Sequence, residues 1–132
     1  MHFYLLDVAD AGVSGGSIDW TLIAVLLVTI VIEAVIMLLI KYNRFRKAIT
    51  DSFIANTASI AAGFILFRLA PGLFGRYSFS NLLILFIVTV AIELAVLYLL
   101  NRKLSMMKTL QTTVMMNLVS YVLFFLLMSM LQ

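Results

Sequence analysis

Four long apolar runs, separated by short polar or charged stretches, dominate this sequence. They cover about residues 20–40, 51–70, 80–100 and 109–131. A helix rises about 1.5 Å per residue, so about 20 apolar residues are enough to cross the roughly 30 Å hydrocarbon core of a bilayer. Each run is therefore predicted to be a membrane-spanning helix. The predicted fold class is an all-α membrane protein with four transmembrane helices.

Composition supports this class and argues against several others. Apolar residues make up 64% of the chain and charged residues 11%, whereas a water-soluble domain needs a larger polar surface. Four spans with short loops leave no room for a separate catalytic or nucleic-acid-binding domain. Cysteine is absent, and we find no nucleophile with a base, metal-ligand cluster or phosphate loop in the sequence. We therefore expect no enzyme activity, no metal, no cofactor and no nucleic-acid partner.

The basic residues predict the orientation of the chain. Residues 41–50 and 101–108 hold most of them, whereas residues 1–19 contain aspartates and neither lysine nor arginine. Cytoplasmic loops carry an excess of Lys and Arg. Both loops are thus expected on the cytoplasmic side of the cell (inner) membrane, with both chain ends outside. The residues that would set this topology or contact lipid headgroups are Lys41, Arg44, Arg46, Lys47, Arg102, Lys103 and Lys108.

The two halves of the chain resemble each other. The first and third spans align without a gap, and the second and fourth align after one extra loop residue. The matched polar pairs are Thr29 with Thr89, Glu33 with Glu93, Asn56 with Asn117, and Ser59 with Ser120. This coincidence predicts two tandem helical-hairpin repeats in parallel orientation. The predicted parts are an acidic extracytoplasmic lead-in at 1–19, a first hairpin at 20–70, a connection at 71–79 and a second hairpin at 80–132.

Helical geometry places the matched polar residues at one depth. At ~1.5 Å per residue, Glu33 lies about 10 Å from the loop end of the first span, and Asn56 about 8 to 12 Å from the start of the second. Thr29 shares the face of Glu33, and Thr89 that of Glu93, because each pair is four residues apart. We therefore predict that each Glu meets the Asn and Ser of its own hairpin. A carboxylate inside a bilayer costs about 2.5 to 3.5 kcal/mol, so the neutral acid is cheaper to hold.

Two functions fit this pattern. In the first, the Glu, Asn and Ser residues are polar clasps, and the protein acts by association within the membrane, as a homo-oligomer or as an accessory subunit of a membrane complex. Its partners would be the lipid bilayer and a membrane protein or a second copy. In the second, the protein is a small proton- or cation-coupled transporter or channel that uses Glu33 and Glu93. The eight matched polar residues are then the candidate intramembrane ion or proton site. The predicted spans lack the helix-breaking proline or unwound glycine pair that builds ion sites in carriers, which favours the first function.

Overall fold

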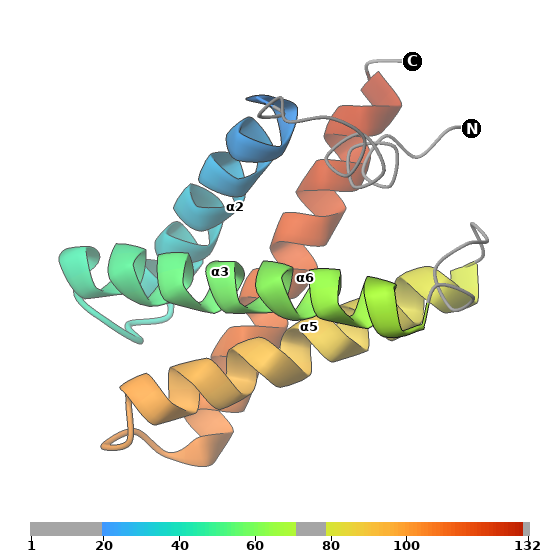
Figure 1. The fold of residues 1–132 in the computed structure, drawn as a ribbon. Coiled ribbons are helices and arrows are strands. Elements are labelled where there is room, and N and C mark those ends of the chain that lie inside the picture. Colours follow the sequence, from blue (N-terminus) through green and yellow to red (C-terminus); the bar gives the residue numbers. More distant parts are fainter. Residues whose placement is uncertain (1–19, 71–78, 131–132) are drawn as a thin grey trace.

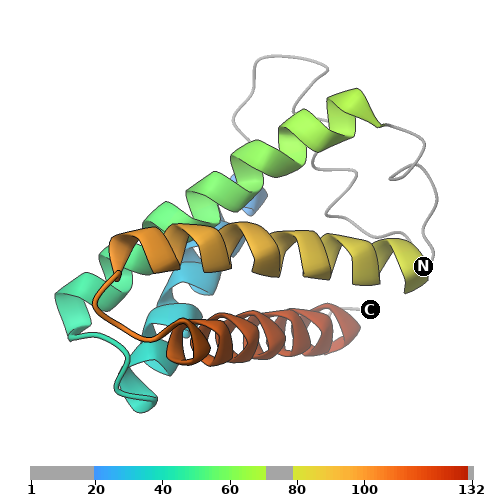
Figure 2. The ribbon, with the colours of Figure 1, turned by 90° about the horizontal axis from the view of Figure 1, so that it is seen from below.

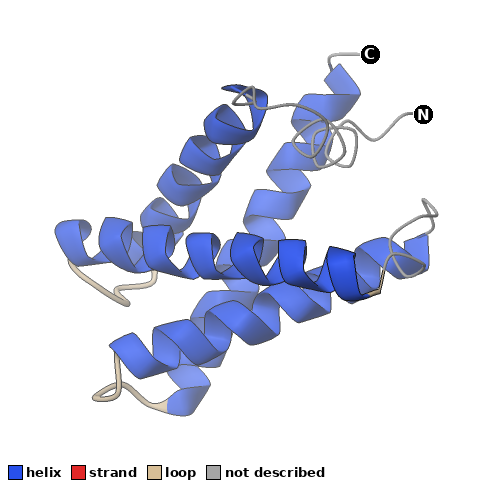
Figure 3. Cartoon of the chain, viewed as in Figure 1, coloured by secondary structure: helices blue, strands red, loops and turns tan. Residues whose placement is uncertain are grey.

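The computed structural model describes residues 20–70 and 79–130, and these residues form four α-helices without a strand (Figures 1 and 3). The helices are α2 (Trp20–Leu39), α3 (Phe45–Leu69), α5 (Phe79–Leu100) and α6 (Met106–Met130). The prediction of an all-helical fold is confirmed for this part of the chain. The predicted lead-in at 1–19 and nearly all of the connection predicted at 71–79 lie outside the described residues.

Two helices begin earlier than the predicted spans. Helix α3 starts at Phe45 and α6 at Met106, whereas the sequence predicted spans from residues 51 and 109. A window of hydropathy detects only the apolar part of a helix, and the first turns of α3 and α6 contain basic residues. The connections between the helices are therefore shorter than the predicted loops.

Local hydrogen bonds explain the early starts. The Ser105 hydroxyl accepts the backbone N–H of Lys108 at 3.2 Å. Ser105 is thus the N-cap of α6, which satisfies one of the free donors of its first turn. Before α3, Arg44 is extended (φ −76, ψ 158), and its carbonyl accepts the N–H of Ala48 at 2.8 Å. Each helix therefore begins directly after its turn.

The turn after α2 is a Schellman motif, in which a left-handed residue ends the helix. Lys41 has φ 53, its N–H donates to the Leu38 carbonyl at 3.0 Å, and the N–H of Tyr42 donates to the Met37 carbonyl at 2.8 Å. Glycine is the usual residue at the left-handed position. Tyr42 and Met37 are both buried in the same core cluster, which is the hydrophobic contact that often accompanies this motif.

The four helices pack in a ring. Helix α2 contacts α3 and α6, and α5 contacts α3 and α6. The two short connections lie at one end of the molecule, as both views show (Figures 1 and 2). Beyond the region where the four helices meet, α2 and α6 diverge from α3 and α5 (Figure 1). The contacts that position the polar residues therefore lie in the half of the ring nearer the connections and around its middle.

The interior of the described part is more polar than its surface. Only small or flexible apolar side chains and one tyrosine join the core cluster, whose buried members are Ala34, Met37, Tyr42, Ala48, Ala55, Leu97 and Met116. More polar than apolar side chains are buried; the polar ones are Glu33, Asp51, Ser52, Asn56, Glu93, Asn101, Thr109, Thr112, Thr113, Asn117 and Ser120. Large apolar side chains are exposed along all four helices.

Two of the helices are long and apolar enough to cross a membrane. Within the described residues these segments are Phe45–Leu66 and Leu83–Leu100, and the apolar part of α2, Ile23–Leu39, is shorter. Little of either long segment is buried inside the molecule. That distinguishes them from the core helices of a soluble protein, which are mostly buried.

Candidate functional site

Glu33 is fully buried on α2 and faces α3. Its Oε2 atom accepts a hydrogen bond from Asn56 Nδ2 at 2.5 Å and lies 2.8 Å from the Ser52 hydroxyl. The Ser52 hydroxyl is also 3.3 Å from the backbone carbonyl of Ile30. The other carboxyl oxygen, Oε1, is buried and has no hydrogen-bond partner among the described residues. All the partners of Glu33 thus gather on one oxygen.

Glu93 is fully buried on α5 and has partners on two helices. Its Oε2 atom accepts from Asn117 Nδ2 on α6 at 2.6 Å, and its Oε1 atom lies 3.1 Å from the Ser59 hydroxyl on α3. The Ser59 hydroxyl is equally near the backbone carbonyl of Asn56, at 3.1 Å. Both carboxyl oxygens of Glu93 are therefore partnered.

Helix α3 connects the two carboxyl groups. Asn56 contacts Glu33 and Ser59 contacts Glu93, and these two α3 residues are themselves joined through the Asn56 carbonyl. The two glutamates are close enough for Glu93 to act on Glu33 electrostatically. They form one polar cluster, although they come from different hairpins.

The predicted Glu–Asn neighbours meet within each hairpin, but the serines differ from expectation. Ser59 contacts Glu93 of the other hairpin rather than Glu33. The Ser120 hydroxyl donates to the Asn117 carbonyl at 3.0 Å and makes no hydrogen bond to either glutamate. The serine that contacts Glu33 is Ser52, one turn before Asn56. Ser52 and Asn56 are four residues apart and therefore share one face of α3.

The two threonines lie at the edge of this cluster. Thr29 and Thr89 are half-buried, one turn before Glu33 and Glu93 respectively. Thr89 hydrogen-bonds the Tyr121 side chain on α6, and neither threonine hydroxyl bonds to a glutamate. That the eight predicted residues together form an ion or proton site stays a prediction.

A second polar cluster, which the sequence did not predict, joins the two connections. Asp51 accepts from Asn43 Nδ2 at 2.5 Å, from Asn101 Nδ2 at 2.8 Å and from Lys47 Nζ at 3.0 Å. Asn43 Nδ2 also donates to Asn101 Oδ1 at 3.1 Å. Asp51 lies inside α3, and its side chain is only 3% exposed.

Two further contacts link the same ends. The Tyr42 hydroxyl donates to Thr109 Oγ1 at 3.3 Å, and Lys108 Nζ donates to the Lys41 carbonyl at 3.0 Å. Burial raises the pKa of Tyr42, with the negative charge of Asp51 adding to the effect and the bond to Thr109 opposing it. The connection after α2 is thus tied to the start of α6.

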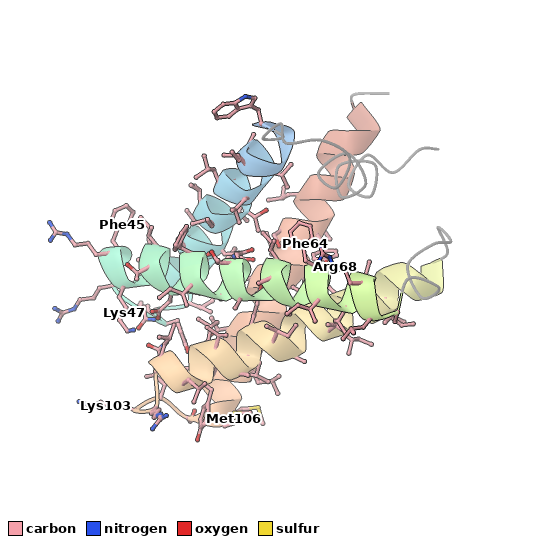
Figure 4. The ribbon with its side chains drawn as sticks, viewed as in Figure 1. Phe45, Lys47, Phe64, Arg68, Lys103 and Met106 are labelled. Atoms are coloured by element: carbon pink, nitrogen blue, oxygen red, sulfur yellow. The ribbon has the colours of Figure 1, made fainter. Side chains whose placement is uncertain are left out.

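The basic residues surround this end of the molecule. Six of the seven predicted topology residues are exposed, and Lys108 is half-buried. Figure 4 shows Lys47 and Lys103 at this end of the molecule, whereas Arg68 lies on the other half of α3. Among the described residues, no three His, Cys, Asp or Glu side chains come together as a metal site would require. The positions of the charges suit contact with an aqueous or headgroup layer.

Comparison with models of protein families, with curated proteins and with solved structures found no match for this chain.

Proposed function

We propose that this chain is an integral membrane protein of four spans in two hairpin repeats, which acts by association within the membrane. It would work as a homo-oligomer or as a small subunit of a membrane complex. The observation that carries the proposal is the inverted distribution of polarity, with glutamates, asparagines and hydroxyl residues inside and large apolar side chains outside. Soluble proteins show the opposite arrangement.

The exposed apolar surface supports a lipid environment on every side. Leu27 on α2, Phe53 on α3, Ile87 on α5 and Leu118 on α6 are each about half exposed or more. A soluble monomer rarely exposes contiguous apolar patches larger than a few hundred Å². Lipid chains or neighbouring membrane helices would cover such a surface at no cost in hydration.

The packing pattern supports the two repeats. Exchanging α2 with α5 and α3 with α6 leaves the set of helix contacts unchanged. Aligned positions also share burial: Met37 and Leu97 are fully buried, as are Ala55 and Met116. A twofold arrangement of hairpins would produce both features.

The short connections of the described part support association as the mode of action. Those between α2 and α3 and between α5 and α6 are only a few residues long. The surfaces that the described residues offer to a partner are therefore helix faces and these connections. The polar clusters would then hold each protomer in one shape, because interhelical hydrogen bonds in membranes contribute modestly, about 0.6 kcal/mol on average, but are directional.

Membrane insertion and topology can be tested with single cysteines, since the chain contains none. We expect the protein to remain in the membrane on alkaline carbonate extraction. A cysteine at Lys103 should react with an impermeant maleimide only from the cytoplasmic side, and one at Ser17 only from the opposite side. Extraction into the soluble fraction, or labelling of both positions from one side, would contradict the four-span topology.

Association can be tested by counting protomers. Single-molecule photobleaching of the Lys103→Cys protein in supported bilayers, at decreasing surface density, should show a fixed number of steps above one. The same count is expected from native mass spectrometry in mild detergent. Association would be ruled out if the protein is monomeric at every density and no other protein co-purifies with it from its native membrane.

Proton- or cation-coupled transport is the second candidate. It is favoured by two fully buried carboxyl groups in one cluster, neither of which pairs with a basic side chain among the described residues. Intramembrane ionisable residues of this kind are candidates for ion or proton pathways. Proton and monovalent-cation flux into liposomes should be compared for wild type, the Glu33→Gln, Glu93→Gln double variant and Ser120→Ala. Flux that only the double variant abolishes would identify a transport site.

A further inference from the structure

We infer that the two buried glutamates are chemically different: Glu33 is held as a neutral acid with its proton on Oε2, whereas Glu93 is the carboxyl group that can release its proton. This inference rests on the proposed function in one respect: inside a membrane, both carboxyl groups would be kept away from bulk water. It makes the cluster a binding site for one exchangeable proton.

One carboxyl oxygen of Glu33, Oε1, has no hydrogen-bond partner among the described residues. A carboxylate shares its negative charge between both oxygens, and a buried charged oxygen without a donor is very unfavourable. Glu33 Oε1 is such an atom if the group is ionised, because nothing in the described part of the chain donates to it. As the carbonyl oxygen of a neutral acid it carries much less charge. The observed geometry therefore suits only the protonated group.

The hydroxyl of Ser52 supplies the acceptor that this proton needs. A serine hydroxyl has one hydrogen to donate and two lone pairs to accept with. Ser52 Oγ is 2.8 Å from Glu33 Oε2 and 3.3 Å from the Ile30 carbonyl. The acid can thus donate from Oε2 to Ser52, which donates onward to Ile30, while Asn56 Nδ2 donates to the same Oε2. Every polar hydrogen in this set then has an acceptor.

Glu93 has partners that suit both of its states. When it is ionised, Asn117 Nδ2 donates to Oε2 and the Ser59 hydroxyl donates to Oε1. When it is neutral, Oε1 donates its proton to Ser59, which turns its own hydrogen to the Asn56 carbonyl at the same distance of 3.1 Å. Rotation of one hydroxyl hydrogen is the only change required. Ser52 can make the same rotation beside Glu33, but Oε1 of an ionised Glu33 would still lack a donor among the described residues.

The surrounding charges favour a single release. The titratable groups near Glu33 are Glu93 on α5 and Tyr121 on α6, while the α3 residues against it, Ser52 and Asn56, do not titrate. Asp51, next to Ser52, is occupied by the cluster at the connections. Once Glu93 is negative, its charge opposes ionisation of Glu33. As pH rises, one proton should therefore leave and the other should stay.

Infrared spectroscopy can test this directly, because Glu33 and Glu93 are the only glutamates in the chain. Labelling glutamate with ¹³C at its side-chain carboxyl carbon shifts the carbonyl stretch of these two groups alone. In the wild-type protein reconstituted in liposomes, we expect two shifted bands from protonated acids at low pH, one of which disappears on alkaline titration. Loss of both bands together, loss of neither, or their absence at low pH would overturn the inference.

Variants assign the bands. In Glu93→Gln the titrating band should be missing and the persistent band unchanged, whereas the reverse result would overturn the inference. Ser59→Ala should change the pH at which the Glu93 band disappears, and the aligned variant Ser120→Ala should leave it unchanged. Circular dichroism and size-exclusion chromatography establish whether each variant is folded. If a variant does not fold, the titration of the wild-type protein still tests the inference. These spectra depend on neither flux nor oligomer size, so their outcome is separate from the tests of association and transport.

Discussion

The two glutamates occupy aligned positions in the two hairpins, yet they are bonded differently. Oε2 of Glu33 is hydrogen-bonded to Ser52 and Asn56, which both lie on α3 of the same hairpin. Its Oε1 has no partner among the described residues. Glu93 has one partner on each oxygen, Asn117 from its own hairpin and Ser59 from the other. The Asn contact is common to both, and the serine contact is not.

The residues aligned with the two serines show where the difference arises. Thr113 aligns with Ser52, but its hydroxyl donates to the Thr109 carbonyl at 2.9 Å. Ser120 aligns with Ser59, and its hydroxyl donates to the Asn117 carbonyl. These two hydroxyl groups of α6 thus bond to their own helix, where their α3 counterparts reach a carboxyl group. Aligned residues of the two hairpins therefore make different hydrogen bonds in the folded chain.

The largest expected effect separates the two asparagines. Asn117→Leu removes the only donor that the described residues offer to Glu93 Oε2, whereas Asn56→Leu leaves Ser52 on the bonded oxygen of Glu33. We expect Asn117→Leu to lower the free energy of unfolding in bicelles by about 2 kcal/mol and Asn56→Leu by about 1 kcal/mol. If the two variants lose the same free energy of unfolding, or Asn56→Leu loses more, then the bond from Asn117 to Glu93 contributes no more than the bond from Asn56 to Glu33.

A smaller effect should distinguish the two glutamates. Glu33→Gln must place its amide N–H groups either against the Asn56 donor or at the Oε1 position, where the described residues offer no acceptor, so it should cost about 1 to 2 kcal/mol. In Glu93→Gln the amide can donate to Ser59, which donates to the Asn56 carbonyl, so the cost should be about 0.5 kcal/mol or less. Unfolding of both variants in the same bicelles measures the difference, and a reversed order would refute the proposed hydrogen-bond arrangement.

The aligned serines provide a matched pair. Ser59→Ala removes a hydroxyl that bridges Glu93 and the Asn56 carbonyl, and should cost about 1 kcal/mol. Ser120→Ala removes a hydroxyl that bonds only to its own helix, and a change of about 0.5 kcal/mol or less is expected. The measurement is again the free energy of unfolding. Similar values for the two variants would show that the contact between hairpins contributes nothing.

The smallest effect concerns the turn of the first hairpin. Lys41 has a left-handed backbone that glycine adopts more readily, so Lys41→Gly should stabilise the protein by about 0.5 to 1 kcal/mol. Lys103, in the corresponding connection of the second hairpin, is not among the non-glycine residues with positive φ. Lys103→Gly is therefore the control and should be neutral or slightly destabilising. A gain for both variants would point to charge rather than backbone conformation.

Local properties of the chain made the helices and the Glu–Asn neighbours predictable. The long apolar runs determine where helices lie, and spacing along a helix determines which residues share a face. The two helices of a hairpin meet at a short connection, so similar residue counts from that connection give similar depths. Glu33 and Asn56 are therefore placed at one depth. The early starts of α3 and α6 were missed because hydropathy does not register a polar first turn or a cap such as Ser105.

Sequence by itself therefore determined an all-helical chain, its apolar faces and the polar residues that meet within each hairpin. Only the tertiary structure decided which serine reaches which carboxyl group, and that Asp51 is buried between Asn43 and Asn101. Two of these contacts, Ser59 with Glu93 and Asn101 with Asp51, join residues of different hairpins, and their formation depends on how α3 lies between α2 and α5. A difference of one hydroxyl orientation leaves no trace in residue spacing, yet it decides which glutamate has a partner on both oxygens among the described residues.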